Sequence, residues 1–494
     1  MLYIGIDLGT SSVKLLLMDE KGVIKKTVSR KYPLFFPQAG WSEQHPQDWL
    51  KETAEGIKEL TADIDRSQVA GIGCCGQMHG LVILDCDDNV IRPAILWNDG
   101  RTTEETDYLN NVIGRDKLSE YTANIAFAGF TAPKVLWVKK HEPENFSKIA
   151  KVMLPKDYIN YMLTGTFCTD VSDASGTLLF DVKNKRWSKE MLHICGLRTE
   201  QLPAVYESSQ TVGTLKENIA RELGLSPKVR VCAGAGDNAG AAVGTGTVGS
   251  EAVNISLGTS GTIFITSKDF CADPNNALHA FAHADGNFHL MGCMLSAASC
   301  NKWWQENILD NEDYVKEEEK IPAELLGRNG VFFLPYLMGE RSPINDTEAR
   351  GAFIGLSPDA DRSAMKLAIL EGVAFAMRDS FEVAKSLGLN IERSEICGGG
   401  AKSPLWRKIF ANVLNIQICT SETEEGPGYG GAILAAVSCG EWETVWQAST
   451  ELLKIKETIS PEPRLAALYE ERYKQFRQIY PALKKLFPLL KVSP

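Results

Sequence analysis

The sequence Ile6-Asp7-Leu8-Gly9-Thr10-Ser11-Ser12 decides the fold, because a close copy of it, Ile255-Ser256-Leu257-Gly258-Thr259-Ser260-Gly261, occurs 249 positions later in the 494-residue chain. Five of the seven residues are identical, and the separation is about half the length of the chain. In both copies an apolar segment leads into Leu-Gly-Thr-Ser and a second apolar segment follows it. A chance match between glycine-rich turns is the alternative, but the shared context and spacing favour two structurally equivalent domains.

The length of the chain also favours two domains, since single hydrophobic cores stop growing near about 250–300 residues. We expect an α/β fold with one domain at residues 1–245, a second at 246–494, and a cleft between them. The Gly- and Ala-rich stretch 233–249 is expected to contain the hinge. A final amphipathic helix from about residue 464 is expected to pack back on the body, with a homodimer contact as its alternative use.

The composition argues against several classes of function. The formal net charge is −11, whereas a nucleic-acid-binding protein would show a basic face. No apolar run approaches the ~18 residues that a membrane span needs, and residues 1–7 lack the basic start of a signal peptide. The 12 cysteines form no C-x-x-C pair, which is typical of a cytosolic chain with reduced thiols. We therefore expect a cytoplasmic protein with small-molecule partners.

The first copy of the repeated stretch has the composition of a phosphate-binding loop beside a metal-binding carboxylate. Glycine allows the backbone to approach a phosphate closely, and consecutive turn N–H groups form a concavity for anions. Asp7, at the end of a predicted strand over residues 2–8, is placed to hold Mg²⁺ through water. Further groups for the phosphates follow in Thr10, Ser11, Ser12 and Lys14. The alternative is a hairpin turn closed by an Asx-type hydrogen bond.

Asp237 is the candidate proton acceptor. It is the only acid in the segment Gly234-Ala235-Gly236-Asp237-Asn238-Ala239-Gly240, where small neighbours leave room for a substrate. A carboxylate in such a position can accept the proton of a reacting hydroxyl. The alternative is an N-cap for the following Ala-rich helix, which would not require so much glycine. Asn238, beside it, is a candidate substrate ligand.

Two polar segments contain the residue types that bind sugars, namely planar polar side chains for directional hydrogen bonds and aromatic faces. The candidates are Gln77, Met78, His79, Trp97, Asn98 and Asp99. A lone histidine is more often a core residue than a ligand, but His79 lies in a loop bounded by Gly76 and Gly80. We therefore expect His79 to contact the substrate directly.

Glycine-rich turns later in the chain are candidate nucleotide contacts. Gly398-Gly399-Gly400-Ala401 follows an apolar strand and would form a flat backbone shelf for a nucleobase or ribose, although a plain strand-to-helix turn is the alternative. In the second Leu-Gly-Thr-Ser copy, Gly258 and Thr259 are the candidates for a second phosphate loop. Three histidines between 279 and 289 have no carboxylate or cysteine at ligand spacing. The Glu-Arg pair at 340–341 fits either a structural role or a role in the cleft.

These motifs together resemble the FGGY family of carbohydrate kinases, within the actin-like ATPase superfamily. One family signature is matched throughout residues 129–141. A second is matched at 351–356 and 368–371 and departs at Ala364, where a polar residue is usual. The resemblance covers essentially the whole chain. It implies two ribonuclease-H-like domains with ATP and Mg²⁺ bound between them.

The resemblance also implies roles for individual residues. Asp237 would be the proton acceptor, and Met78 and His79 would lie at the sugar. For the nucleotide and its metal, the resemblance implies contacts from Asp7, Thr10, Gly258, Thr259, Gly399, Gly400 and Ala401.

Three segments, at residues 76–80, 95–101 and 154–158, are most similar to the family members that phosphorylate D-xylulose. Relatives that use glycerol carry an Arg-Glu pair where Met78 and His79 stand in this chain. We therefore expect transfer of the γ-phosphoryl group of ATP to D-xylulose. The alternatives are another ketose or a polyol, an ATP-driven binding protein, and a sugar-binding regulator without turnover.

Overall fold

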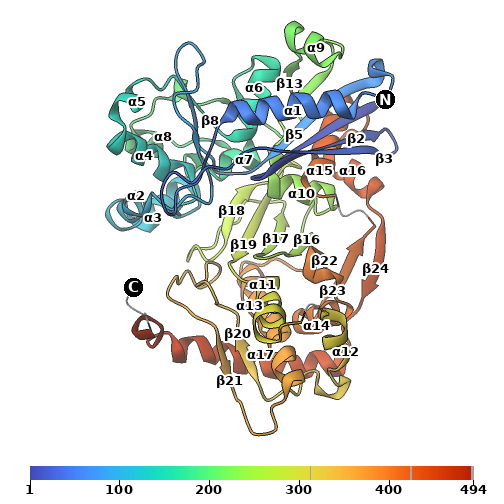
Figure 1. The fold of residues 1–494 in the computed structure, drawn as a ribbon. Coiled ribbons are helices and arrows are strands. Elements are labelled where there is room, and N and C mark those ends of the chain that lie inside the picture. The colour runs from blue at the N-terminus through green and yellow to red at the C-terminus, as the bar shows by residue number, and fades with distance from the viewer. Residues whose placement is uncertain (312, 423–424, 491–494) are drawn as a thin grey trace.

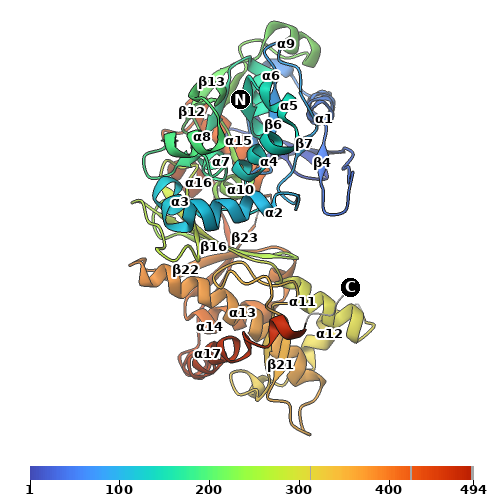
Figure 2. The same ribbon diagram turned by 90° about the vertical axis from the view of Figure 1, so that its left-hand side faces the viewer.

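The computed structural model describes residues 1–311, 313–422 and 425–490, which form an elongated molecule with two α/β halves (Figure 1). Each half is built on a seven-stranded sheet. Figure 1 shows the two sheets one above the other, with helices packed around each. Figure 2, turned by 90°, shows the same division into an upper and a lower half.

The first sheet consists of β1 (Leu2–Leu8), β2 (Ser12–Asp19), β3 (Ile24–Lys31), β5 (Val69–Gly76), β13 (Thr211–Thr214), β14 (Arg230–Cys232) and β15 (Ala235–Gly236). Its order is β13-β14-β5-β1-β2-β3, with β15 paired to β5. The central strand β1 runs antiparallel to β2, with Asp7 opposite Lys14, and parallel to β5. Both faces of β1 and β5 are buried, which explains their nearly continuous apolar sequences.

The second sheet consists of β16 (Val253–Leu257), β17 (Gly261–Ser267), β18 (His279–Ala282), β19 (Phe288–Met294), β22 (Arg393–Cys397), β23 (Gln417–Ser421) and β24 (Ile455–Ile459). Its order is β18-β19-β17-β16-β22-β23-β24. As in the first sheet, the central strand β16 runs antiparallel to its hairpin partner β17 and parallel to its other neighbour, β22. The two Leu-Gly-Thr-Ser copies are thus equivalent turns, and the expected α/β fold with two sheet-containing halves is confirmed.

Two helices, α10 (Asp237–Gly244) and α15 (Pro427–Cys439), lie between the sheets and contact each other (Figure 1). α15 also packs on β1 and β5, although it follows the second sheet in sequence. The two helices meet backbone to backbone, since a Cβ added at Gly430 would lie 1.9 Å from the Gly240 carbonyl oxygen. Glycine at this position permits the close approach. A helix from the second half of the sequence therefore covers the first sheet and joins the two halves.

The stretch 233–249, where we expected the hinge, is mostly taken up by β15 and α10. Because α10 is packed against α15, bending within residues 237–244 would break this contact. Residues 245–252, which form neither helix nor strand, connect α10 to β16. A boundary at 245/246 remains our proposal for the sequence division, with α15 as a helix that crosses it in space.

The final helix, α17 (Pro463–Leu483), packs against α13 (Arg362–Ser386) and α14 (Pro404–Leu414). The ring centroid of Phe476 on α17 lies 5.3 Å from that of Phe375 on α13. In this position the helix covers the second half of the molecule. Among the described residues, no helix is both long enough and apolar enough to cross a membrane.

Candidate active site

The turn between β1 and β2 is held in place by neighbouring side chains. The Gly9 N–H donates to the Ser12 carbonyl at 3.1 Å, which closes the turn. Tyr32 Oη donates to the Gly9 carbonyl, and Gln44 Nε2 donates to the Thr10 carbonyl at 2.7 Å. These bonds fix the shape of the turn without a ligand, as a preorganised anion site requires.

Lys14 joins this turn to the helix that crosses from the second half. Its Nζ lies 2.5 Å from Glu425 Oε2, and Glu425 lies just before α15. Ser11 is exposed at the tip of the turn, and Ser12 begins β2. Partly exposed ion pairs contribute only about 0–1 kcal/mol. Lys14 can therefore exchange Glu425 for a phosphate at little cost in stability.

Gln77 and Trp97, which we expected at the sugar, contact Thr10 in the turn between β1 and β2. Thr10 Oγ1 donates to Gln77 Oε1 at 3.2 Å and accepts from Trp97 Nε1 at 2.9 Å. Gln77 is almost fully buried, and its Nε2 donates to Gln44 Oε1 at 3.2 Å. The structure thus places the polar atoms of both side chains where they orient Thr10.

Asp237 is the first residue of α10, and the N-cap is Gly236, which has no side chain to cap the helix. Asp237 Oδ1 accepts from the backbone N–H of Asn238 at 2.8 Å and from its Nδ2 at 3.1 Å. Burial and the nearby negative charge of Asp7 raise the pKa of Asp237 to about 7. A carboxyl group with this pKa is suited to proton transfer near neutral pH.

The segment before Asp237 packs closely on the end of β5, to which β15 is paired. Gly234 has a φ of +78°, and a Cβ there would lie 1.9 Å from the Cys74 carbonyl oxygen. The Gly236 N–H donates to Ser172 Oγ at 3.1 Å. The glycines around Asp237 are therefore required by the backbone as well as by the space for a substrate.

A buried charge cluster lies behind this segment, and sequence reasoning missed it. Lys156 Nζ lies 2.7 Å from Asp157 Oδ1 and 3.1 Å from Asp170 Oδ1, and all three side chains are buried. Lys156 also donates to the Ala233 carbonyl at 3.2 Å, and Ser172 Oγ donates to Asp170 Oδ2 at 2.5 Å. The cluster thus anchors the chain before Asp237 at two points. The available signal was the Lys-Asp pair inside the 154–158 segment.

The charge of this cluster is only partly balanced. Burial lowers the pKa of Lys156, but the carboxylates of Asp157, Asp170 and Asp173 outweigh burial and hold it well above its usual value. Burial raises the pKa of Asp173 well above its usual value, and in the described residues neither of its oxygens has a hydrogen-bond partner. A single lysine cannot neutralise three buried carboxylates, and the raised pKa of Asp173 favours its protonated form.

Met78 lies close to Asn238, the neighbour of Asp237. Asn238 Nδ2 lies 3.7 Å from Met78 Sδ and, as described above, also donates to Asp237. The structure therefore brings Met78, Asn238 and Asp237 together, as we expected for a substrate site. His79 follows with a φ of +69°, a left-handed conformation that is uncommon outside glycine.

The His79 ring is held in one tautomer. Its Nδ1 lies 2.6 Å from the Gly176 carbonyl oxygen, and the ring stacks on Phe130 with centroids 4.7 Å apart. Since a carbonyl only accepts, Nδ1 carries the proton and Nε2 is left as an acceptor for a hydroxyl. Burial lowers the pKa of His79 to about 3, so the ring is neutral at physiological pH.

Asp99 is engaged by the protein itself. It accepts from the Ser42 N–H at 2.6 Å, from the Arg101 N–H at 3.0 Å and from Arg101 Nε at 2.8 Å. Its side chain is fully buried, and the Arg101 guanidinium lies 3.7 Å over the Trp41 ring. These contacts make Asp99 an organiser of the 97–101 loop, and we no longer assign it to the sugar. Asn98, beside it, is exposed.

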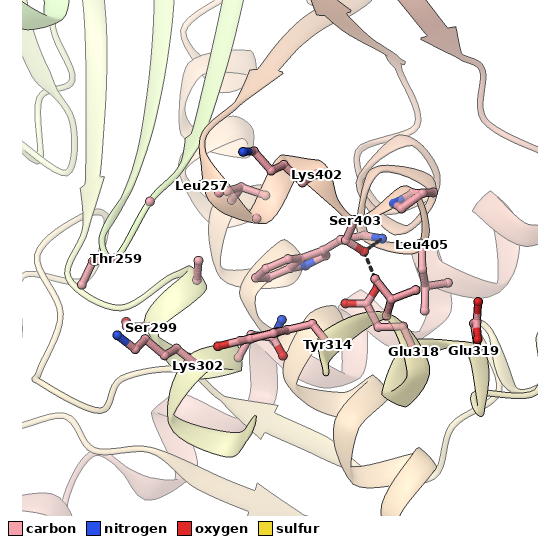
Figure 3. Close-up of a pocket in the computed structure, with 18 residues that line it drawn as sticks. Leu257, Thr259, Ser299, Lys302, Tyr314, Glu318, Glu319, Lys402, Ser403 and Leu405 are labelled. Carbon is pink, nitrogen blue, oxygen red and sulfur yellow. Dashed lines mark hydrogen bonds between the residues drawn. The ribbon is translucent and has the colours of Figure 1, made fainter. Parts of the chain in front are cut away.

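A cavity of about 720 Å³ opens beside the turn between β16 and β17 (Figure 3). Its walls are mostly apolar, and the carbon-rich faces come from Leu257, Tyr314, Pro404, Leu405 and Trp406. Polar groups at its edge come from Lys302, Glu318, Lys402 and Ser403. This size and an apolar lining with few polar groups are typical of small-molecule sites and suit a nucleobase and its ribose.

Both predicted nucleotide turns line this cavity, at 258–259 and at 399–400. The Ala298 N–H donates to the Gly258 carbonyl at 2.9 Å, and the Ala297 N–H donates to the Thr259 carbonyl at 3.0 Å, and these bonds fix the turn at 258–259. Ala401 is buried behind the 399–400 turn. The structure therefore groups these residues at one end of the site.

Asp7 is the residue that fits a bound Mg²⁺. It is partly buried at the end of β1, and burial raises its pKa to about 6. In the described part of the chain, no three ligand-type side chains come together to form a metal site. Mg²⁺ beside phosphates is usually held by one or two carboxylates, with phosphate oxygens and water completing the shell. The donor set therefore fits a metal that arrives with the nucleotide.

Comparisons with known proteins identify the family of the chain. The model of the FGGY family of carbohydrate kinases, N-terminal domain, matches residues 2–244, and that of its C-terminal domain matches residues 253–439. The xylulose kinase of Escherichia coli (strain K12) is 39% identical over 99% of this chain and 100% of its own length.

Solved structures show the same fold along the whole chain. A crystal structure of a "xyloylose kinase" from Brucella ovis matches with a TM-score of 0.94 and 40% identity, over 98% of this chain and 100% of its own. A gluconate kinase from Lactobacillus acidophilus matches with a TM-score of 0.93 and 27% identity, over 99% of both chains. From the family models and the full-length relatives, the chain belongs to the FGGY family of carbohydrate kinases.

Proposed function

We propose that this carbohydrate kinase transfers the γ-phosphoryl group of ATP to the C5 hydroxyl of D-xylulose, giving D-xylulose 5-phosphate and ADP. The observation that carries the proposal is the position of Asp237, which lies beside Met78 and Asn238 and within the electrostatic reach of Asp7. The choice of sugar is supported by the E. coli xylulose kinase, which is similar over its full length.

In the proposed reaction, Asp237 accepts the proton of the sugar hydroxyl as its oxygen bonds to phosphorus and the bond to the ADP oxygen breaks. Its pKa of about 7 makes it a stronger base than an ordinary carboxylate, while a large share of molecules still carries the deprotonated form. Met78, His79 and Asn238 position the sugar. The turns that contain Thr10 and Thr259 hold the phosphates from the two halves.

Mg²⁺, held through Asp7, would neutralise charge on the phosphates when it is bound. The residues of the chain contribute by positioning the two substrates and by excluding water from the site. Catalysis of this kind depends mainly on orientation and electrostatic stabilisation, because phosphoryl transfer demands little covalent chemistry from the protein.

The test is a coupled assay of ADP release across D-xylulose, D-ribulose, xylitol, glycerol and D-gluconate. We expect D-xylulose to have a kcat/KM at least ~10-fold above that of the other substrates, the discrimination expected when a site hydrogen-bonds a substrate group. D-Gluconate is included because a gluconate kinase shares the fold at 27% identity. A higher kcat/KM with any other substrate, or no turnover with D-xylulose, would refute the proposal.

A further inference from the structure

Arg341, whose role the sequence left open, lies in a turn fixed to the edge of the second sheet. The Ser342 N–H donates to the Cys293 carbonyl at the end of β19, at 2.9 Å. Glu340 Oε1 accepts from the Leu295 N–H at 2.8 Å and from the Arg341 N–H at 2.7 Å. Glu340 is buried, so these bonds hold the backbone of Arg341 in one position. The turn is therefore a rigid support for the Arg341 side chain.

The guanidinium group of Arg341 reaches the first half of the molecule. Its Cζ lies 5.3 Å from the ring centroid of Phe127, which lies 5.6 Å from that of Phe130. Phe130 in turn stacks on His79, the expected sugar ligand. Burial lowers the pKa of His79, and the positive charge of Arg341 acts in the same direction. Arg341, in the opposite half, therefore lies next to the aromatic side chains that pack on the loop carrying Met78 and His79.

The Arg341 side chain contacts the Phe127 ring and the Cys293 thiol, whereas the neighbouring Glu340 carboxylate accepts from the backbone N–H groups of Leu295 and Arg341. Other shielded arginines lie beside a carboxylate, since Arg101 lies 2.7 Å from Asp99 and Arg472 lies 2.8 Å from Glu371. Arg341 is only half-exposed, and a shielded guanidinium needs oxygen acceptors for its five N–H donors. The hydroxyl and carbonyl oxygens of a bound sugar are acceptors of this kind.

Asp237 and Arg341 approach the loop that carries Met78 and His79 through different neighbours. Asn238 Nδ2 lies 3.1 Å from Asp237 Oδ1 and 3.7 Å from Met78 Sδ. Arg341 instead lies over the Phe127 ring, next to Phe130, which stacks on His79. The two groups can therefore contact different parts of one bound sugar.

We propose that Arg341 is a specificity residue that donates hydrogen bonds to the C2 carbonyl and C1 hydroxyl oxygens of the ketose. Asp237 would then act on the C5 hydroxyl at the other end of the same molecule. The inference rests on the proposed function and adds to it the residue that distinguishes a ketose from a polyol. It also gives the sugar a contact in each half of the enzyme.

The experiment compares the kinetics of the wild type with Arg341→Met, Arg341→Lys and Arg350→Met. Arg350 is an exposed arginine of the following loop and donates to the Thr347 carbonyl at 3.0 Å, so its replacement is a matched control. The substrates are D-xylulose, xylitol, which lacks the carbonyl group, and 1-deoxy-D-xylulose, which lacks the C1 hydroxyl. KM and kcat are measured for each sugar and for ATP, and thermal unfolding shows whether each variant is folded.

We expect Arg341→Met to raise the KM for D-xylulose at least ~10-fold and to lower the preference for D-xylulose over the two analogues by a similar factor. The KM for ATP should stay within about twofold, because the nucleotide turns are unchanged. Arg341→Lys should shift the preference in the same direction, since an ammonium group lacks the bidentate fork. If Arg341→Met does not fold, the kinetics of Arg341→Lys alone test the proposal. Arg350→Met should behave as the wild type.

An unchanged KM for D-xylulose would overturn the inference, as would an equal loss for all three substrates, because a purely structural role weakens every sugar alike. These results require an enzyme that is active on D-xylulose. A wild type without that activity would refute the proposed function, so the two failures are distinguishable.

Discussion

The raised pKa of Asp237 predicts how turnover depends on pH. Burial and the charge of Asp7 both disfavour the carboxylate, and they raise the pKa to about 7. If Asp237 accepts the proton of the sugar, only its deprotonated form is active, so kcat/KM for the ketose should rise with a midpoint near that value. At pH 6 about a tenth of the molecules would be deprotonated, and the rate should be about a tenth of its plateau.

Asp237→Asn removes the base and keeps the shape of the side chain. A positioned base contributes about 10²–10⁴-fold, so the variant should lose at least that lower factor in kcat and should lose the rise near pH 7. The assay is the initial rate of ADP release from about pH 5.5 to about pH 9 at saturating MgATP in one mixed buffer. Binding of ATP, measured by calorimetry, should stay close to that of the wild type.

The raised pKa of Asp237 also predicts that the folded protein becomes less stable as the pH rises, whereas its activity increases. In the unfolded chain Asp237 ionises near its ordinary pKa of 3.8, whereas in the folded protein it ionises only near 7. Folding therefore becomes less favourable as the pH rises between these values, by at most about 4 kcal/mol, and by less because the side chain is partly exposed. Asp237→Asn should raise the unfolding temperature at pH 8, and the gain should fall toward zero near pH 4.

Two results would refute this account of Asp237. One is a variant whose kcat remains within about tenfold of the wild type, and the other is a wild-type profile that is flat across about pH 5.5–8. Asp7 has a pKa raised to about 6, so it can add a second rise, at lower pH, to the profile of rate against pH. The variant separates the two groups, because it should retain only the step that belongs to Asp7.

Three further predictions concern the metal, the sugar and the buried cluster. Asp7→Ala should raise the Mg²⁺ concentration for half-maximal turnover at least ~10-fold with ketose binding intact, and an unchanged Mg²⁺ titration would contradict the metal role. His79→Ala should raise the KM for the ketose about 10-fold and leave that for ATP unchanged, whereas a loss of thermal stability alone would show a core role. Lys156→Met should lower the free energy of unfolding in denaturant by about 3–5 kcal/mol, with the exposed Lys148→Met as its control; a similar value for both would show that the cluster is not charge-dependent.

The duplicated fold could be predicted, and the candidate residues at its turns could be located, because both depend on features that are local in sequence. A phosphate turn needs glycine and hydroxyl residues directly after a strand, and both Leu-Gly-Thr-Ser copies stand there in the structure. Asp237 could be singled out for a similar reason, since the glycines that surround it are required by close packing on β5. In each case the functional residue and the glycines that the backbone conformation requires occur within one short segment.

The roles of several other residues depend on partners that are distant in sequence, and for this reason they could not be predicted. Gln77 and Asp99 have the same chemistry as a sugar ligand, but Thr10 and Arg101 engage their polar atoms. The Lys156 cluster could not be recognised as a whole, because Asp170 and Asp173 come from a later part of the chain than the adjacent pair Lys156 and Asp157. The packing of α15 on the first sheet likewise depends on glycines in both partners, and no periodicity in either segment indicates the other.

The position of α10 suggests how the enzyme can bind its sugar before it completes the site. The N-terminus of α10 carries Asp237, and its middle meets α15 at Gly240, so the base cannot shift without disturbing that contact. Met78 contacts Asn238 on the same helix, and this part of the sugar site therefore moves as one unit with the base. The proposed second phosphate loop and Arg341 belong to the other half, and residues 245–252 connect α10 to its first strand. A sugar held by Met78 and Arg341 at once would draw these parts together, whereas water, which cannot span them, would leave the site incomplete.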